Sequence, residues 1–191
     1  MKKLSAYLFL ILFSFSAPSF ADDIRDFEIE GISIGDSLLD FLPENKIIKD
    51  YYIGNKYFRS VLLSKRDTDF PNPIDYDVVF GIVESSNSSY NIESVNGFIM
   101  YEDINNCFKE MKNVNTIISQ LFPKVKKNNS EKNHPEDPTK KSKIYQTTFL
   151  VSNDGVIKVA CLDMSVATGK LDTLAVVIRT LKYDRWFENE Y

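Results

Sequence analysis

The clearest chemistry in this sequence belongs to its two cysteines, Cys107 and Cys161. Two thiols in an oxidising compartment form a disulfide when the fold brings them together, whereas a redox-active pair is usually closely spaced in the chain. Cys107 falls on the apolar stripe of the strongest predicted helix, and Cys161 alternates with Ile157 and Val159 in a predicted strand. We therefore predict a Cys107–Cys161 disulfide between helix and sheet, with two buried free thiols as the alternative.

A serine in a nucleophile-like context occurs near the N-terminus. The segment Gly35-Asp36-Ser37-Leu38 resembles the first block of GDSL/SGNH esterases, and this resemblance implies that Ser37 is a nucleophile. A serine hydroxyl needs a neighbouring base, which that family takes from an Asp-x-x-His block near the C-terminus. The sequence has one histidine, His134, preceded at that spacing by Glu131 within a charged segment. The alternative is that Asp36 caps a short helix, and we favour it.

Basic side chains are concentrated between Lys124 and Lys143, where seven lysines accompany three acidic residues. With Pro135 and Pro138 inside it, this segment is predicted to be a long polar loop. Its charge would suit an anionic partner such as lipid headgroups or a polyanionic sugar, and the alternative is a solvated, mobile loop. His134 lies in this segment without a second ligand at metal-binding spacing, and the sequence contains no phosphate-binding loop. We therefore expect no metal and no cofactor.

Residues 1–21 have the three parts of an export signal. Lys2 and Lys3 precede a short apolar run, and Ser19-Phe20-Ala21 predicts cleavage before Asp22. The apolar run is shorter than the roughly 20 residues of a membrane-spanning helix. We therefore expect a periplasmic or secreted protein that does not span the membrane after cleavage. Removal of the two lysines lowers the net charge from −4 to −6. An acidic chain of this kind is not expected to bind nucleic acid.

The elements that must position these residues follow from periodicity and turn signals. The strongest helix is predicted from Asp103 to Phe122, and shorter helices are expected after Asp36 and after Pro43. Strands are predicted at 24–34, 57–64, 76–84, 92–101, 144–151, 156–163 and 172–181.

Short turns between consecutive strands favour antiparallel pairing. The predicted fold class is therefore α+β, as a single domain of residues 22–191 with an antiparallel sheet and helices packed on one of its faces. The order helix–three strands occurs twice, which suggests two helix–three-strand halves as a further hypothesis.

The segment from Phe27 to Phe41 resembles the opening of exported proteins of AT-rich marine alphaproteobacteria, and the likeness continues through Val95–Ile99 and around both cysteines. That resemblance implies export and no particular activity. More remotely, Gly31-Ile32-Ser33-Ile34-Gly35 entering a helix resembles helix–helix–three-strand envelope modules, namely outer-membrane assembly lipoproteins and tandem-repeat β-lactamase inhibitor proteins. The chain lacks the lipidated cysteine of the former.

Together these observations predict an exported, non-catalytic binding or interaction module of the bacterial envelope, with an envelope protein or a small ligand as its partner. The alternatives are a carrier of small apolar ligands and a GDSL-type esterase that uses Ser37.

Overall fold

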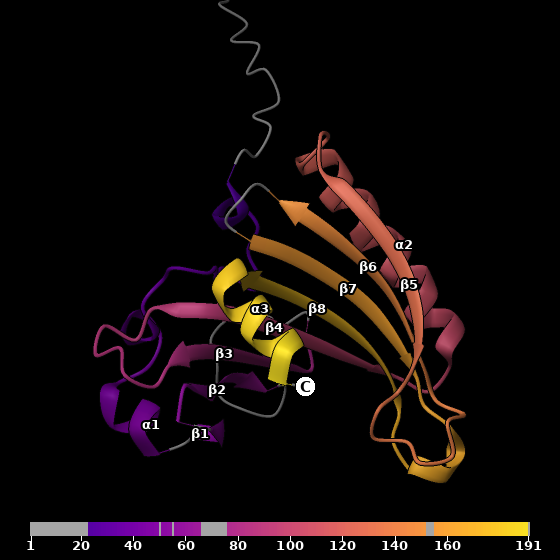
Figure 1. Cartoon of the computed structure of the whole chain (residues 1–191), viewed down its shortest axis with the longest axis horizontal. Helices are drawn as coiled ribbons and strands as arrows, with labels where there is room; N and C mark the ends of the chain where they lie inside the picture. Colours follow the sequence, from indigo (N-terminus) through magenta and orange to yellow (C-terminus); the bar gives the residue numbers. More distant parts are fainter. Residues whose placement is uncertain (1–22, 50, 55, 66–75, 152–154, 191) are drawn as a thin grey trace, which may run out of the picture.

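The structure, a computed structural model, describes residues 23–49, 51–54, 56–65, 76–151 and 155–190. It contains one eight-stranded sheet in the order β1-β2-β3-β4-β8-β7-β6-β5, in which all neighbours are antiparallel (Figure 1). The strands are β1 (Tyr51–Gly54), β2 (Phe58–Lys65), β3 (Val78–Glu84), β4 (Ile92–Tyr101), β5 (Lys126–Asn133), β6 (Lys143–Val151), β7 (Gly155–Asp163) and β8 (Asp172–Thr180). The helices are α1 (Glu44–Lys49), α2 (Ile104–Leu121) and α3 (Leu181–Glu190), with the 3-10 helices η1 (Ile24–Asp26), η2 (Leu38–Asp40) and η3 (Val166–Thr168). The expected α+β class with an antiparallel sheet is confirmed.

The sheet consists of two four-strand meanders that meet at its centre. Strands β1 to β4 follow one another in space, as do β5 to β8, and β4 pairs with β8 from Ser94↔Arg179 to Tyr101↔Asp172. Helix α2 leaves β4 at the centre and leads to β5 at one edge. Each meander is preceded by a helix. The order is therefore helix–four strands, which corrects the three strands expected for each half.

Strand β5 lies in the segment Lys124–Lys143, which was wrongly predicted to be a loop throughout. It pairs with β6 without a register shift, from Lys126↔Leu150 to Asn133↔Lys143, and all eight of its residues are exposed. A strand that buries no side chain has no apolar alternation for sequence analysis to detect. Backbone pairing with β6 forms it, and polar, lysine-rich residues are typical of a sheet edge.

Helices α2 and α3 cover opposite faces of the sheet, which corrects the expectation that helices pack on one face. Alternate residues of a strand point to opposite faces. On β7, Cys161 is bonded to α2, whereas Lys158 lies 2.6 Å from Asp184 of α3. Figure 1 shows α3 in front of the sheet and α2 behind it. Helix α3 was not among the predicted elements. Its Tyr183 packs against Phe58 and forms a small aromatic cluster.

The predicted strand at 24–34 is instead a 3-10 helix followed by a tight turn. Asp23 caps η1, and the chain then reverses through Glu30 and Gly31, which have φ angles of 54° and 74°. Ile29 and Ile32 face each other across this turn in an isolated bridge, and both are buried. The apolar residues of 24–34 are therefore buried as the pattern predicts, but the backbone is not an extended strand.

The predicted disulfide is present. Cys107 of α2 and Cys161 of β7 are bonded, with their Cα atoms 5.9 Å apart and both side chains fully buried. Such a bond suggests that the protein folds in an oxidising compartment outside the cytoplasm. The expected signal at residues 1–21 and the cleavage before Asp22 lie outside the described residues. In the described part of the chain, no helix has the length and apolar character needed to cross a membrane.

Candidate functional site

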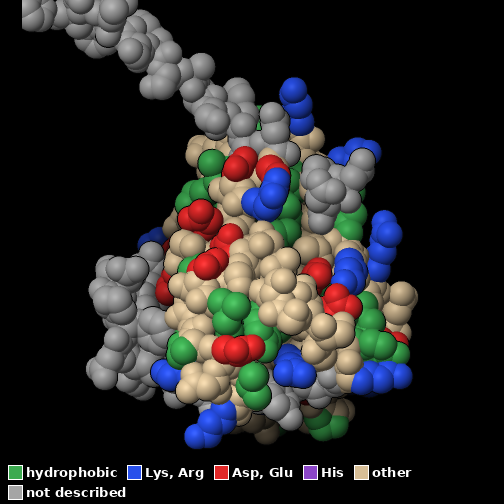
Figure 2. Space-filling model, turned by 90° about the vertical axis from the view of Figure 1, so that its left-hand side faces the viewer, with side chains coloured by type: hydrophobic (Ala, Val, Ile, Leu, Met, Phe, Trp, Pro, Cys, Tyr) green, Lys and Arg blue, Asp and Glu red, His purple; other side chains and the backbone are tan. Residues whose placement is uncertain are grey.

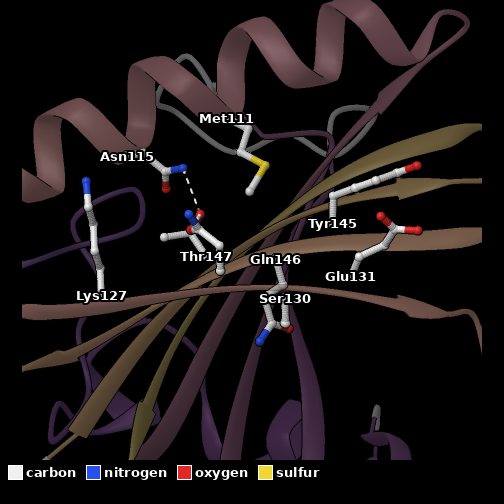
Figure 3. Close-up of a pocket in the computed structure, with 9 residues that line it drawn as sticks. Met111, Asn115, Lys127, Ser130, Glu131, Tyr145, Gln146 and Thr147 are labelled. Carbon is white, nitrogen blue, oxygen red and sulfur yellow. Dashed lines mark hydrogen bonds between the residues drawn. The ribbon is translucent and has the colours of Figure 1, made fainter.

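An open groove of about 510 Å³ lies between α2 and the edge formed by β5 and β6 (Figure 3). Helix α2, strand β5 and strand β6 all contribute side chains to its lining, among them Met111, Asn115, Lys127, Glu131, Tyr145 and Thr147. Figure 3 shows Met111 and Asn115 pointing from the helix towards the strands, while Lys127 rises from β5 towards the helix. We refer to this feature as the α2–β5 groove.

The local sequence explains why these side chains converge. Asn115 follows Met111 by about one helical turn, at the flank of the stripe that buries Ile118 against the sheet. On β6, Thr147 pairs with Val159 of β7, a residue on the face that α2 covers. Thr147 therefore places a hydroxyl at an inward position where its neighbours are apolar.

Three polar side chains form a chain of hydrogen bonds across the groove. Asn115 Nδ2 donates to Thr147 Oγ1 at 3.1 Å, and Thr147 Oγ1 donates to Asn129 Oδ1 at 2.9 Å. Thr147 is only 5% exposed. The remaining oxygen, Asn115 Oδ1, is buried and accepts no hydrogen bond from the described residues. A buried acceptor without a donor is unfavourable, and a ligand that donates an N–H or O–H to it would relieve that cost.

The rim of the groove combines charge with aromatic surface. Lys127 lines it from β5, and Lys112 lines its continuation along α2. Glu131 is on the same side and lies 3.4 Å from Lys143 in an exposed ion pair. The Tyr145 ring meets Phe108 of α2 edge-on, with centroids 5.1 Å apart. These groups suit recognition by hydrogen bonds, charge and ring contacts.

The hydroxyl of Thr147 donates its proton to an amide oxygen, which is not a base, so this hydrogen bond does not activate the hydroxyl as a nucleophile. Within the residues that the structure places, no group of three histidine, cysteine, aspartate or glutamate side chains could hold a metal ion.

The end of β5 is fixed by an ordered turn built around Asp137. Its carboxylate, 3% exposed, accepts hydrogen bonds from the backbone N–H and hydroxyl groups of both Thr139 and Ser142, and from the hydroxyl of Ser165. The hydrogen bonds from Ser142, and then those from Thr139, hold the pKa of Asp137 well below its usual range. The segment predicted to be a long polar loop is thus a strand followed by a turn that is ordered by hydrogen bonds.

The structure does not bring Ser37 and His134 together. Ser37 Oγ donates to the backbone oxygen of Ser89 at 2.8 Å beside the β3–β4 turn, and Ser37 is the N-cap of η2. That capping role was expected for Asp36, whose carboxylate instead accepts from the backbone N–H of Ser33 at 2.8 Å. His134 lies in the turn that follows β5 at one edge of the sheet, whereas Ser37 forms an isolated bridge with Asn91, just before the central strand β4.

The space between α2 and the sheet, where an apolar ligand would be carried, is packed with the protein's own side chains. Its fully buried members include Cys107, Ile118, Val159, Leu174 and Val176. The α2–β5 groove lies beyond this layer, at the polar edge of the sheet. On the face shown in Figure 2, charged side chains of both signs surround small, separate groups of hydrophobic ones. Neither the α2–β5 groove nor the face in Figure 2 offers a broad apolar surface.

Sequence analysis did not identify Asn115, Thr147 or Asn129. One signal was available, since Thr147 interrupts the inward apolar alternation between Tyr145 and Phe149. Asn129 gave no signal, because its pairing with Thr147 depends on a strand that was not predicted. Comparison with models of known protein families, with curated proteins and with solved structures finds no match to this chain. Inference about function therefore rests on the geometry described above.

Proposed function

We propose that this chain is an exported, non-catalytic binding module of the bacterial envelope and that it engages its partner through the α2–β5 groove. The observation that carries the proposal is the buried Oδ1 of Asn115, a residue that lines the open groove. The described residues supply no donor to this acceptor. The side chain is held in place by its own bond to Thr147, so the acceptor is positioned before a ligand arrives. Preorganised polar groups of this kind favour specific binding.

The location of the protein is part of the same proposal. We expect residues 1–21 to direct export and to be removed before Asp22, which leaves a periplasmic or secreted protein. The Cys107–Cys161 bond supports an oxidising destination. Mass spectrometry of the exported protein should find Asp22 at the N-terminus, and a retained Met1 would contradict the processing.

The groove is tested by filling it. Thr116 is exposed and lines the groove where it continues along α2, whereas its neighbour Ile117 is 51% exposed and is not among the lining residues. Immobilised wild type, Thr116→Trp and Ile117→Trp would be incubated with an envelope fraction, and retained components quantified by mass spectrometry. Wild type and Ile117→Trp should retain the same component. Thr116→Trp should retain at least about tenfold less of it, which corresponds to a loss of roughly 1.4 kcal/mol in binding free energy. Equal retention by both tryptophan variants would rule out the groove as the binding site.

A further inference from the structure

Strand β5 has one edge of backbone groups that does not face β6. It ends the sheet and pairs with β6 alone, in an unbroken register, and every one of its residues is exposed. The backbone N–H of His134 donates to the oxygen of Ser142, which continues the β5–β6 ladder by one pair. In an antiparallel ladder, pairs that exchange hydrogen bonds alternate with pairs that do not. The His134–Ser142 pair exchanges hydrogen bonds, so the backbone N–H and C=O groups of positions 132, 130, 128 and 126 also bond to β6. The N–H and C=O groups of positions 127, 129, 131 and 133 therefore point away from the sheet.

The same four positions carry the side chains on the α2 side of β5. Asn129 bonds to Thr147, which in turn bonds to Asn115 of α2, and Lys127 and Glu131 line the groove. The outward backbone edge and the α2–β5 groove thus share one set of residues. A strand added along this edge would pair with β5, and its alternate side chains would face the groove.

The charge of the edge selects the chemistry of such a strand. Lys126, Lys127 and Lys132 accompany a single acid, Glu131, on β5, and Lys112 lines the groove from α2. This basic edge belongs to a chain whose net charge is −4. An extended acidic segment would therefore be complementary to it.

A second copy of the chain fits the edge less well. Self-pairing through the outward groups of both copies sets odd positions opposite odd ones. Centred on Asn129, it places Lys126 opposite Lys132 twice and brings together two strands that each carry three lysines and one glutamate. Like charges directly opposite each other destabilise a strand pair, and lysines on an edge strand are a known means of preventing self-association.

From this arrangement we infer that β5 accepts an extended, acidic polypeptide segment as a ninth strand of the sheet. The inference rests on the proposed binding function and specifies the class of ligand. Its backbone pairs with the outward groups of positions 127, 129, 131 and 133. Its acidic side chains lie near Lys112 and Lys127 on the α2 side and near Lys126 and Lys132 on the other.

The test uses the whole mature protein, labelled with ¹⁵N, and a blocked peptide of about eight residues in which glutamate and threonine alternate, a length that matches an ordinary strand. Amide hydrogen exchange is measured with and without peptide. The peptide should slow exchange at the N–H groups of Lys127, Asn129, Glu131 and Asn133, because these become hydrogen-bonded. Binding should weaken as salt is added, since the ion pairs involved are exposed. A peptide with lysine in place of glutamate should not bind.

Two substitutions at one residue separate backbone pairing from charge. Glu131→Pro removes an outward N–H that β6 does not use, and proline is tolerated at such edge positions. Glu131→Gln removes the same charge but keeps the N–H. Loss of an acid should strengthen binding of an acidic peptide about two- to threefold in the glutamine variant. The proline variant should bind about two- to tenfold more weakly than the glutamine variant, because a backbone hydrogen bond is lost. Asn133→Pro repeats the test with no change in charge.

Other outcomes overturn the inference in distinguishable ways. Slowed exchange around Asn115 without slowing at the four outward amides would keep the groove as a binding site but reject strand addition. Equal binding by the proline and glutamine variants would do the same. Equal binding of the lysine peptide would reject an acidic occupant. No response to the acidic peptide at low salt would also reject strand addition, and the Thr116→Trp experiment would still decide whether the groove binds a partner.

Discussion

Cys107 of α2 and Cys161 of β7 are bonded across the main helix–sheet interface, with their Cα atoms 5.9 Å apart. Tyr145, which lines the α2–β5 groove, is the direct neighbour of Cys161 on the adjacent strand β6. The disulfide therefore fixes the helix that forms one wall of the groove against the strands that form the other. Stability and the geometry of the binding site depend on the same bond.

Reduction of this bond should destabilise the protein. Cross-linking residues this far apart contributes up to about 4 kcal/mol in the chain-entropy model. The free energy of unfolding of wild type should therefore fall on reduction, whereas reductant should not affect Cys107→Ser/Cys161→Ser. The single variant Cys161→Ser should cost more than lost loop closure, because it places a hydroxyl in a fully buried apolar layer. Two reactive thiols in unfolded, unreduced chains would show that the bond is absent.

Substitution of Asn115 should separate binding from stability. Asn115→Leu loses the bond to Thr147 but also removes the buried oxygen that has no donor, so stability should change by less than about 1 kcal/mol. Binding through the groove should be lost. Thr147→Val is the comparison, since it leaves Asn115 Nδ2 and Asn129 Oδ1 without their partner and should cost about 1–2 kcal/mol. Denaturant unfolding gives the stability of both variants. A larger loss of stability for Asn115→Leu than for Thr147→Val would contradict the prediction.

Asp137 should contribute stability that depends on pH. Hydrogen bonds from Ser142 and Thr139 lower the pKa of its carboxyl in the folded state, so folding favours the ionised form. That contribution is present above the unfolded pKa of about 3.9 and is lost as the pH falls towards the folded value. Asp137→Asn should therefore be less stable than wild type at neutral pH, and the difference should shrink below about pH 4. Urea unfolding across this range measures it, and a difference that is constant with pH would refute the assignment.

The ion pairs beneath α3 should respond unequally to substitution. Lys158, 8% exposed, lies 2.6 Å from Asp184, which is also 3.4 Å from Arg179. Asp184→Ala leaves Lys158 with Glu188, 2.7 Å away, and leaves Arg179 without the Asp184 carboxylate, so it should cost about 2 kcal/mol. Lys158→Met leaves Asp184 paired with Arg179, and the methionine side chain can still pack on the sheet. This variant should therefore lose clearly less stability than Asp184→Ala. Thermal unfolding of both variants provides the comparison, and an equal or reversed order would contradict the shared role of Asp184.

Local sequence patterns were sufficient to predict the elements that bury one side. The apolar stripe of α2 appears where it was predicted, the helix begins after Asp103 as expected, and β4 spans the predicted residues. The disulfide also followed from sequence, since Cys107 and Cys161 each lie on the buried side of a periodic element. In these cases a local pattern records burial directly, because every third or fourth residue of a helix, or every second residue of a strand, faces the core.

The two edges of the sheet, and the site at one of them, depend on long-range contacts that local sequence patterns do not contain. Strands β1 and β5 were both missed, and β5 exists because its backbone pairs with β6 rather than because its side chains are buried. The convergence of Asn115, Thr147 and Asn129 depends on that pairing and on how α2 docks. The placement of α2 and α3 on opposite faces is likewise a long-range outcome. Register between strands and the docking of a helix join residues far apart in the chain, so no local pattern encodes them.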